Sequence, residues 1–297
     1  MKTKTQFVDE SSKNAFKTIL IMAGLSGFIV AVGYLMANVT GNSSYMTYAL
    51  IIAVGQNFIS YFLGPNIALS SSGAVEADED KYSDLHRIVE DVSKEAKIKK
   101  PSVHIINDPA PNAFATGRGH NSSHVAVTTG LLAMLDRGEI SGVIAHEVTH
   151  IKNRDMLVMT SVVTMSAVLS TLANMAMFSS MSKDNKDGGS GGGVMLLIGI
   201  LGSILMPIAL MIIQMSISRK REFMADAGGA ILTSHPEALA SALLKISGYK
   251  QPLQHASTAT AHLYISCPFG GANYQSFWQK LFMTHPPVEE RVEALMN

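Results

Sequence analysis

The sequence predicts a protein of the α+β class, mainly α-helical with a small β-sheet, that crosses a membrane several times. Four long runs lack charged residues, and the segments between them combine helical apolar spacing with short runs typical of strands. Only 15% of the 297 residues are charged and the mean hydropathy is +0.22. Soluble proteins have about 25% charged residues, so the composition also favours a membrane protein.

The uncharged runs are residues 18–37, 46–69, 157–181 and 193–217. Each reaches the roughly 20 residues that a helix needs to cross a bilayer. Four such runs favour membrane helices over the buried helices of a soluble core. The first run is longer than the apolar region of a signal peptide and no strong cleavage site follows it, so we expect a retained anchor.

Basic residues gather before the first run and after the fourth. They are Lys2, Lys4, Lys13 and Lys17 on one side, and Arg219, Lys220 and Arg221 on the other. The 38–45 loop between the first two runs has no charge. Because Lys and Arg are enriched on the cytoplasmic side of membrane proteins, both termini are expected in the cytoplasm.

These runs divide the chain into four parts. Residues 1–69 are expected to form a two-span anchor, and 156–217 a two-span hairpin. Residues 70–155 and 218–297 are expected to be the first and second parts of one folded domain outside the membrane.

The first part of this domain contains the predicted sheet. Residues 70–83 are small and acidic and are interpreted as a linker, and 84–97 have apolar residues at helical spacing. Residues 102–106 and 124–128 are predicted strands. Residues 112–116 are a candidate edge strand, which would either bind an extended peptide through main-chain hydrogen bonds or belong to a structural hairpin.

A metal-binding pattern follows in His146-Glu147-Val148-Thr149-His150. Apolar residues at helical spacing around it predict a helix, on which positions i and i+4 share one face. His146 and His150 can therefore direct two imidazole nitrogens at one Zn²⁺, which accepts three protein ligands and keeps an open position. Glu147 is offset from this pair and can act as a general base on water.

A carboxylate ligand is available downstream, where Glu222 and Asp226 are again separated by four residues. One carboxylate can complete a His₂Glu site, and we assign Glu222 to this role. The other, Asp226, can accept the free ring N–H of a ligand histidine and so fix its orientation. Only residues 151–156 separate His150 from the third uncharged run, a helical distance of roughly 10 Å. The site is therefore expected at the membrane surface.

These motifs resemble those of the HtpX family of membrane-bound zinc endopeptidases, which are related to the CAAX prenyl endopeptidases. The resemblance covers nearly the whole chain and includes the membrane runs. Besides the two zinc motifs it includes the segments Asn112-Ala113-Phe114-Ala115 and Thr284-His285-Pro286-Pro287, the latter followed by Glu290-Arg291.

The resemblance implies a gluzincin-like metallopeptidase domain at the cytoplasmic face of a bacterial inner membrane. It implies one Zn²⁺ per chain, held by His146, His150 and Glu222. Glu147 would be the catalytic base, and Asp226 would orient a ligand histidine. The expected substrates are polypeptides, in particular misfolded membrane proteins, and the expected role is in the response to stress. The sequence carries no indication of the oligomeric state.

Two other functions are compatible with the histidine motif. A site-2-type intramembrane protease shares the motif but places it inside a hydrophobic span, whereas the charged residues Lys152, Arg154 and Asp155 follow it here. A non-catalytic metal-binding scaffold or transporter would use the same ligands but would not need Glu147. The uncharged spans suggest no intramembrane ion pathway.

Other features predict no further site. The net charge is zero and no basic patch with aromatic residues occurs, so nucleic acid is not an expected partner. The single cysteine, Cys267, excludes an intrachain disulfide. His120 and His124 are in a predicted turn and are assigned no metal. His285 precedes two prolines and is interpreted mainly as part of a helix start, with oxyanion stabilisation as the weaker alternative.

Overall fold

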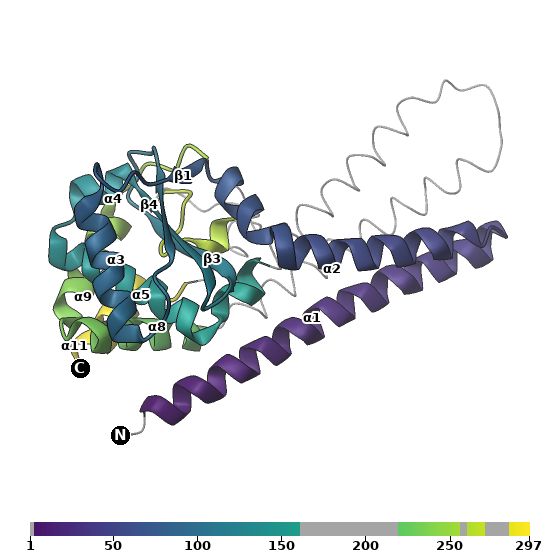
Figure 1. Ribbon diagram of the computed structural model, residues 1–297, viewed down its shortest axis with the longest axis horizontal. Helices are drawn as coiled ribbons and strands as arrows, with labels where there is room; N and C mark the ends of the chain where they lie inside the picture. The colour runs from purple at the N-terminus through teal and green to yellow at the C-terminus, as the bar shows by residue number, and fades with distance from the viewer. Residues whose placement is uncertain (1–2, 161–218, 256–259, 271–284) are drawn as a thin grey trace.

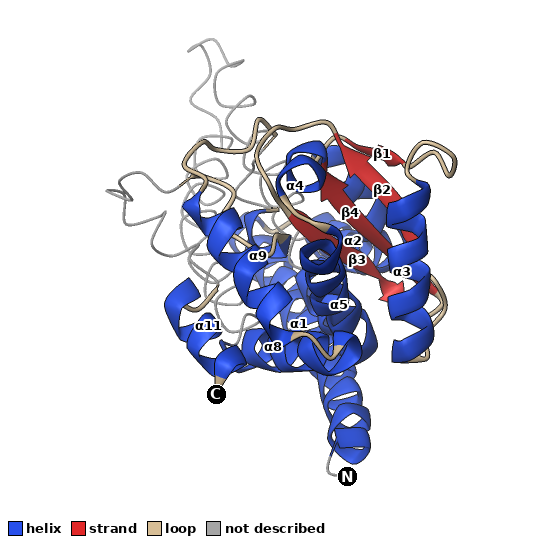
Figure 2. Cartoon of the chain, turned by 90° about the vertical axis from the view of Figure 1, so that its left-hand side faces the viewer, coloured by secondary structure: helices blue, strands red, loops and turns tan. Residues whose placement is uncertain are grey.

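The computed structural model describes residues 3–160, 219–255, 260–270 and 285–297. A pair of long helices extends from a globular part in which further helices pack around a four-stranded sheet (Figures 1 and 2). This part of the chain confirms the expected class, mainly α-helical with a small β-sheet.

The long helices are α1 (Thr3–Thr40) and α2 (Ser44–Ser71). The segment Ser12–Asn38 and the whole of α2 are long and apolar enough to cross a membrane. Large apolar side chains project outward from both helices, as a lipid-facing surface requires. The exposed ones include Phe16, Ile19, Leu20, Tyr34, Leu35, Tyr48, Leu50, Ile51, Val54 and Phe58.

Of the four predicted membrane spans, the described residues contain two candidates. The predicted runs at 157–181 and 193–217 lie outside these residues, apart from 157–160.

Small side chains allow α1 and α2 to approach closely. A Cβ atom on Gly33 would lie 2.2 Å from Cβ of Ala49, so the glycine is required at this crossing. Farther along, Asn57 Nδ2 donates a hydrogen bond of 2.7 Å to Oγ of Ser26. An interhelical hydrogen bond between polar side chains adds to the packing where lipid offers no alternative partner.

The sheet has the strand order β1-β2-β4-β3, with β1 (Ala74–Glu76), β2 (Ser102–Ile106), β3 (Ala113–Gly119) and β4 (Ser122–Thr128). Strands β2 and β4 are parallel, whereas β1–β2 and β3–β4 are antiparallel. The predicted strands at 102–106 and 124–128 are confirmed. The segment predicted at 112–116 is an edge strand, β3, and it also forms a hairpin with β4.

The linker predicted at 70–83 was wrong in part, because it contains strand β1. Val75 lies opposite Ile105 of β2 in the ladder. A strand of three residues is too short to produce an alternating pattern in the sequence, and its small and acidic neighbours dominate the composition.

Both faces of the sheet are covered. Val103, Val125 and Val127 point to a core shared with α3 (Ser83–Ala96) and α5 (Arg137–Asn153). The opposite face carries a second apolar cluster, in which Phe114 meets Tyr264 edge to face and the C-terminal end of α2 packs alongside. The sheet therefore joins the long helices to the helix that carries the histidine motif. The helix predicted at 84–97 is confirmed as α3.

Helix α5 begins and ends with well-defined caps. Asp136 accepts a hydrogen bond from N of Glu139, and Glu139 accepts one from N of Asp136, which is a capping box. Glu139 also binds Lys245 and Ser241 of α9 (Pro236–Gly248). The helix ends at Asn153, and the next residue, Arg154, has a φ of 59° in the left-handed region.

Helix α8 (Arg219–Thr233) crosses α5 at a pair of glycines. A Cβ atom on Gly228 would lie 2.4 Å from Cγ2 of Thr149, and one on Gly229 would lie 3.0 Å from the backbone nitrogen of His146. No larger residue fits at this crossing without moving one helix. The remaining elements of the described residues are η1 (Ala261–Leu263), α11 (Val288–Met296) and the short helix α4 (Thr129–Met134).

Replacing Gly228 by alanine is expected to destabilise the protein by about 1–3 kcal/mol, because the added methyl group overpacks the α5–α8 contact. Thermal unfolding of the detergent-purified protein measures the effect. Gly248→Ala is the matched control, since a Cβ atom there meets nothing within 4 Å. An equal loss of stability in both variants would contradict the close helix crossing.

Candidate active site

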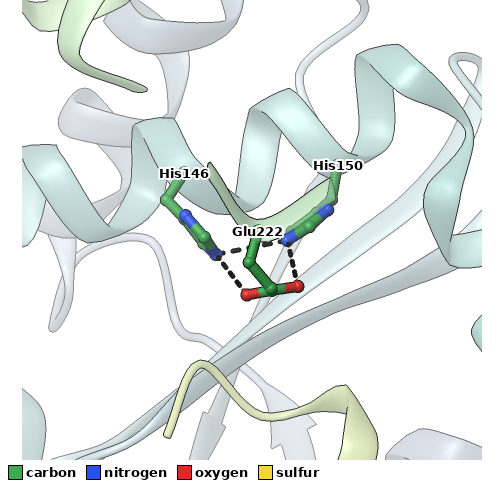
Figure 3. A group of neighbouring side chains, drawn as sticks. All are labelled: His146, His150 and Glu222. Atoms are coloured by element: carbon green, nitrogen blue, oxygen red, sulfur yellow. Dashed lines mark hydrogen bonds and ion pairs between the residues drawn. The ribbon is translucent and has the colours of Figure 1, made fainter. Parts of the chain in front are cut away.

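One face of α5 carries the predicted histidines. His146 and His150 are buried, and their Nε2 atoms lie 3.2 Å apart because the two residues are one helical turn from each other. Figure 3 shows both rings pointing to the same side of the helix. The prediction that the two imidazoles converge is confirmed by this geometry.

Helix α8 brings Glu222 to the same point. Its Oε2 atom lies 3.8 Å from Nε2 of His146, and its Oε1 atom lies 3.6 Å from Nε2 of His150 (Figure 3). The carboxylate is completely buried. Within the described part of the chain, these three residues form the one cluster whose donor atoms all lie within 4.8 Å of one another and suit a metal ion.

The far side of each ring is held by a carboxylate. Nδ1 of His146 donates to Oδ1 of Asp226 at 2.9 Å, and Nδ1 of His150 donates to Oδ2 of Asp155 at 3.0 Å. The contact of Asp226 with a histidine of the motif was predicted from the sequence. Asp155 was not predicted to take part, because its approach depends on the left-handed turn at Arg154.

This donor set fits a divalent cation. With a proton on each Nδ1, the two Nε2 atoms present lone pairs to each other and to the Glu222 carboxylate. Among the described residues, no hydrogen-bond donor reaches Oε1 of Glu222. Buried acceptors that face one another are costly unless a proton or a cation lies between them. Two imidazole nitrogens and a carboxylate are ligands that zinc accepts.

The surrounding carboxylates and burial also determine which of the two histidines holds a proton. Burial favours a neutral His150, but Asp155 and Glu222 outweigh it and raise the pKa of His150 to about 9. Burial lowers the pKa of His146 to about 4 despite the contact with Asp226. A metal ion at the Nε2 atoms would therefore replace a proton that His150 otherwise holds.

Glu147 lies beside the cluster without belonging to it. Burial, with a smaller contribution from the charge of Glu222, raises the pKa of Glu147 to about 7. Its carboxylate accepts a hydrogen bond from the backbone N–H of Ala115 on β3. A carboxyl group with a pKa near 7 can both accept and release a proton at neutral pH, as a general base and acid requires.

Arg291 of α11 anchors Asp226 from the opposite side. Its Nε and Nη2 atoms donate to both carboxylate oxygens of Asp226 at 2.8 and 2.7 Å, and Nη1 donates to the backbone oxygen of Ile265. Burial alone would raise the pKa of Asp226, but Arg291 and His146 lower it. The sequence contained Arg291 in its C-terminal motif but gave no indication of this partner.

His285 also reaches the site. Its Nδ1 atom lies 2.7 Å from Oε2 of Glu222. Burial opposes the ionised form of Glu222, yet the neighbouring His285 and His150 hold its pKa well below the usual range. The predicted helix start is confirmed, since α11 begins at Val288 after Pro287. The contact with Glu222 was missed, because the sequence separates the two residues widely.

Of the other histidine pair, His120 lies in the turn between β3 and β4, and His124 lies on β4. His120 contacts the backbone oxygen of Lys152 at 2.9 Å, and His124 stacks edge to face with His104 on the sheet. Neither belongs to the metal-binding cluster among the described residues.

A helix with the His-Glu-x-x-His pattern, joined by a carboxylate from a second helix, is typical of metalloproteases with a His₂Glu site. Comparison with known proteins identifies the family: residues 79–297 match the model of peptidase family M48, and the chain belongs to this family. It is a membrane-associated metalloprotease, and the resemblance to the HtpX family is confirmed.

Two relatives illustrate the match. A protease HtpX homolog of Caldanaerobacter subterraneus subsp. tengcongensis is 42% identical over 99% of both chains. A protease HtpX homolog of Pyrococcus furiosus is 43% identical over 94% of both chains. The crystal structure of S. mikatae Ste24p has a TM-score of 0.51 at 15% identity, covering 98% of this chain and 67% of that chain. This last likeness shows a shared fold.

Replacing Arg291 by methionine is expected to destabilise the protein by about 3–5 kcal/mol, because Asp226 would remain as a buried charge without its cationic partner. For a chain of this size, the midpoint of thermal unfolding should fall by roughly 10 °C. Glu293→Gln on the exposed side of α11 is the control. An unchanged midpoint for Arg291→Met would show that the ion pair is not the support described above.

Proposed function

We propose that the chain is a zinc endopeptidase of a bacterial inner membrane that cleaves misfolded membrane proteins at the cytoplasmic face. One Zn²⁺ per chain would be held by His146, His150 and Glu222. The observation that carries this proposal is the convergence of two Nε2 lone pairs and one carboxylate in a buried cluster. Residues 1–69 would anchor the enzyme, and 70–155 and 218–297 would form its catalytic domain around the hairpin 156–217.

The metal and the protein divide the chemistry between them. When bound, zinc supplies Lewis-acid polarisation of the scissile carbonyl and lowers the pKa of a water molecule. Glu147 accepts the proton of the attacking water and passes it to the leaving nitrogen. Asp226 and Asp155 hold the two imidazole rings with their Nε2 atoms directed at the centre. Burial of the cluster keeps bulk water from screening these charges.

Substrate binding along strand β3 is supported by its position at the sheet edge. The backbone N–H of Ala115 points to Glu147, so a peptide paired with this edge would pass the catalytic carboxylate. The backbone oxygen of Ala113 accepts a hydrogen bond from N of Ile265, which limits the open edge at that end. An extended polypeptide bound through its main chain suits an enzyme that acts on unfolded segments of many sequences.

The cytoplasmic location is supported by the lysines before the first span and by the basic residues that open α8. A site-2-type arrangement is disfavoured, because α5 packs against a sheet and other helices instead of lying inside a span. The metal-binding scaffold remains the alternative that an experiment must separate, since it would share every ligand.

Glu147→Gln separates the two functions. For the protease, we expect bound zinc to stay equimolar with the chain while cleavage of an unfolded protein falls at least about 100-fold, because the base is lost and the ligands remain. Zinc content and cleavage are both measured on the full-length protein in detergent. Glu95→Gln, an exposed change on α3, is the control, and Glu222→Ala should lose zinc and activity together. Cleavage that persists in zinc-loaded Glu147→Gln would contradict the assigned base.

A further inference from the structure

The first long helix reaches the active site through one polar side chain. Asn14 lies near the N-terminal end of α1, at the start of the candidate span Ser12–Asn38, and only 1% of its surface is exposed. Its Nδ2 atom donates to Oδ1 of Asp155 at 2.7 Å and to the backbone oxygen of Asn153 at 3.0 Å. In Figure 1 this end of α1 runs beneath the globular part of the chain.

Asp155 links this contact to the histidine motif. Helix α5 ends at Asn153, and the left-handed conformation of Arg154 turns the chain so that Asp155 faces back along the helix. Oδ2 of Asp155 accepts the hydrogen bond from Nδ1 of His150, while Oδ1 accepts the one from Asn14. The two oxygens of one buried carboxylate thus connect α1 with a proposed metal ligand.

The hydrogen bond from Asn14 can hold the carboxylate of Asp155 in place. A fully buried carboxylate requires donors for both oxygens, and an amide supplies one without adding a charge. Arg221 of α8 lies 3.7 Å from the same Oδ1 atom, too far for a hydrogen bond. Among the described residues, Asn14 is therefore the donor that fixes Oδ1 of Asp155 at hydrogen-bond distance. The second bond of Asn14, to the backbone of Asn153, fixes the amide against the end of α5.

We propose that Asn14 is a positioning residue of the active site, which holds Asp155 and thereby the ring of His150 in the orientation that binds the metal. This inference rests on the proposed function, because it requires His150 to be a ligand. Groups that hydrogen-bond to a ligand histidine on the side away from the metal raise metal affinity by fixing the orientation of the ring. Metal binding would then depend on how α1 packs against the end of α5.

The release rate of zinc tests this role. Zinc-loaded full-length protein in detergent is mixed with a chelating indicator, and the rate of zinc transfer is recorded. Asn14→Leu keeps the side-chain size but removes both donors, and it should speed release about tenfold, the lower end of the range for groups behind a ligand. Thr18→Val is the matched control one turn along α1, since its buried hydroxyl bonds only to the backbone oxygen of Asn14 in the described structure. It should release zinc at the wild-type rate.

A double-mutant cycle distinguishes positioning from helix packing. Asp155→Asn should itself speed release, and adding Asn14→Leu to it should cause little further change, because both act on His150 through one carboxylate. If Asn14→Leu does not fold, as judged by thermal unfolding, the nearly isosteric Asn14→Asp takes its place. Repulsion from Asp155 should make that variant release zinc faster than wild type.

The outcomes separate this inference from the proposed function. Wild-type release rates in the Asn14 variants would overturn the positioning role and leave the metal site intact. The same conclusion would follow if the double variant released zinc faster by the product of the two single-variant factors. Failure of the wild-type protein to bind zinc would overturn the metal site and this inference with it.

Discussion

The close contact between α5 and α8 is the constraint on which the site depends. The candidate metal-binding cluster needs side chains from both helices, and Glu222 reaches the two histidines only if the backbones nearly touch. Gly228 and Gly229 make this approach possible, since a Cβ atom at either would meet Thr149 or the backbone of His146. The capping box at Asp136 and the left-handed turn at Arg154 fix the two ends of α5. A geometry set by backbone contact resists small shifts better than one set by surface loops.

Charge balance explains why these groups tolerate burial. Among the described residues, the site contains four buried carboxylates, one of them in the cluster itself, and two buried guanidinium groups. The carboxylates are Glu147, Asp155, Glu222 and Asp226, and the guanidinium groups are Arg221 and Arg291. Buried charges require compensation, so the excess of negative charge favours either protonated histidines or a divalent cation. The same excess of negative charge raises the pKa of His150 through Asp155 and Glu222, whereas the raised pKa of Glu147 comes mainly from burial.

The sequence predicted the parts of the site that depend on local spacing. His146 with His150, and Glu222 with Asp226, are pairs four residues apart, and helical geometry alone places each pair on one face. The supporting residues Asp155, Arg291, His285 and Asn14 were not predicted in these roles, because their contacts arise from a turn or from helices distant in the sequence. Strand β1 was missed because three residues carry no periodic signal. The two later membrane runs lie outside the described residues, so they stay predictions.

Zinc K-edge X-ray absorption of the purified full-length protein tests the central claim most directly. The structure predicts a shell of nitrogen and oxygen at about 2.0–2.1 Å, with the outer-shell scattering of two imidazole rings. In Glu222→Ala, this signal should be lost together with the zinc. A sulfur shell at about 2.3 Å, or a site without imidazole scattering, would contradict the assignment of His146, His150 and Glu222 as the metal ligands.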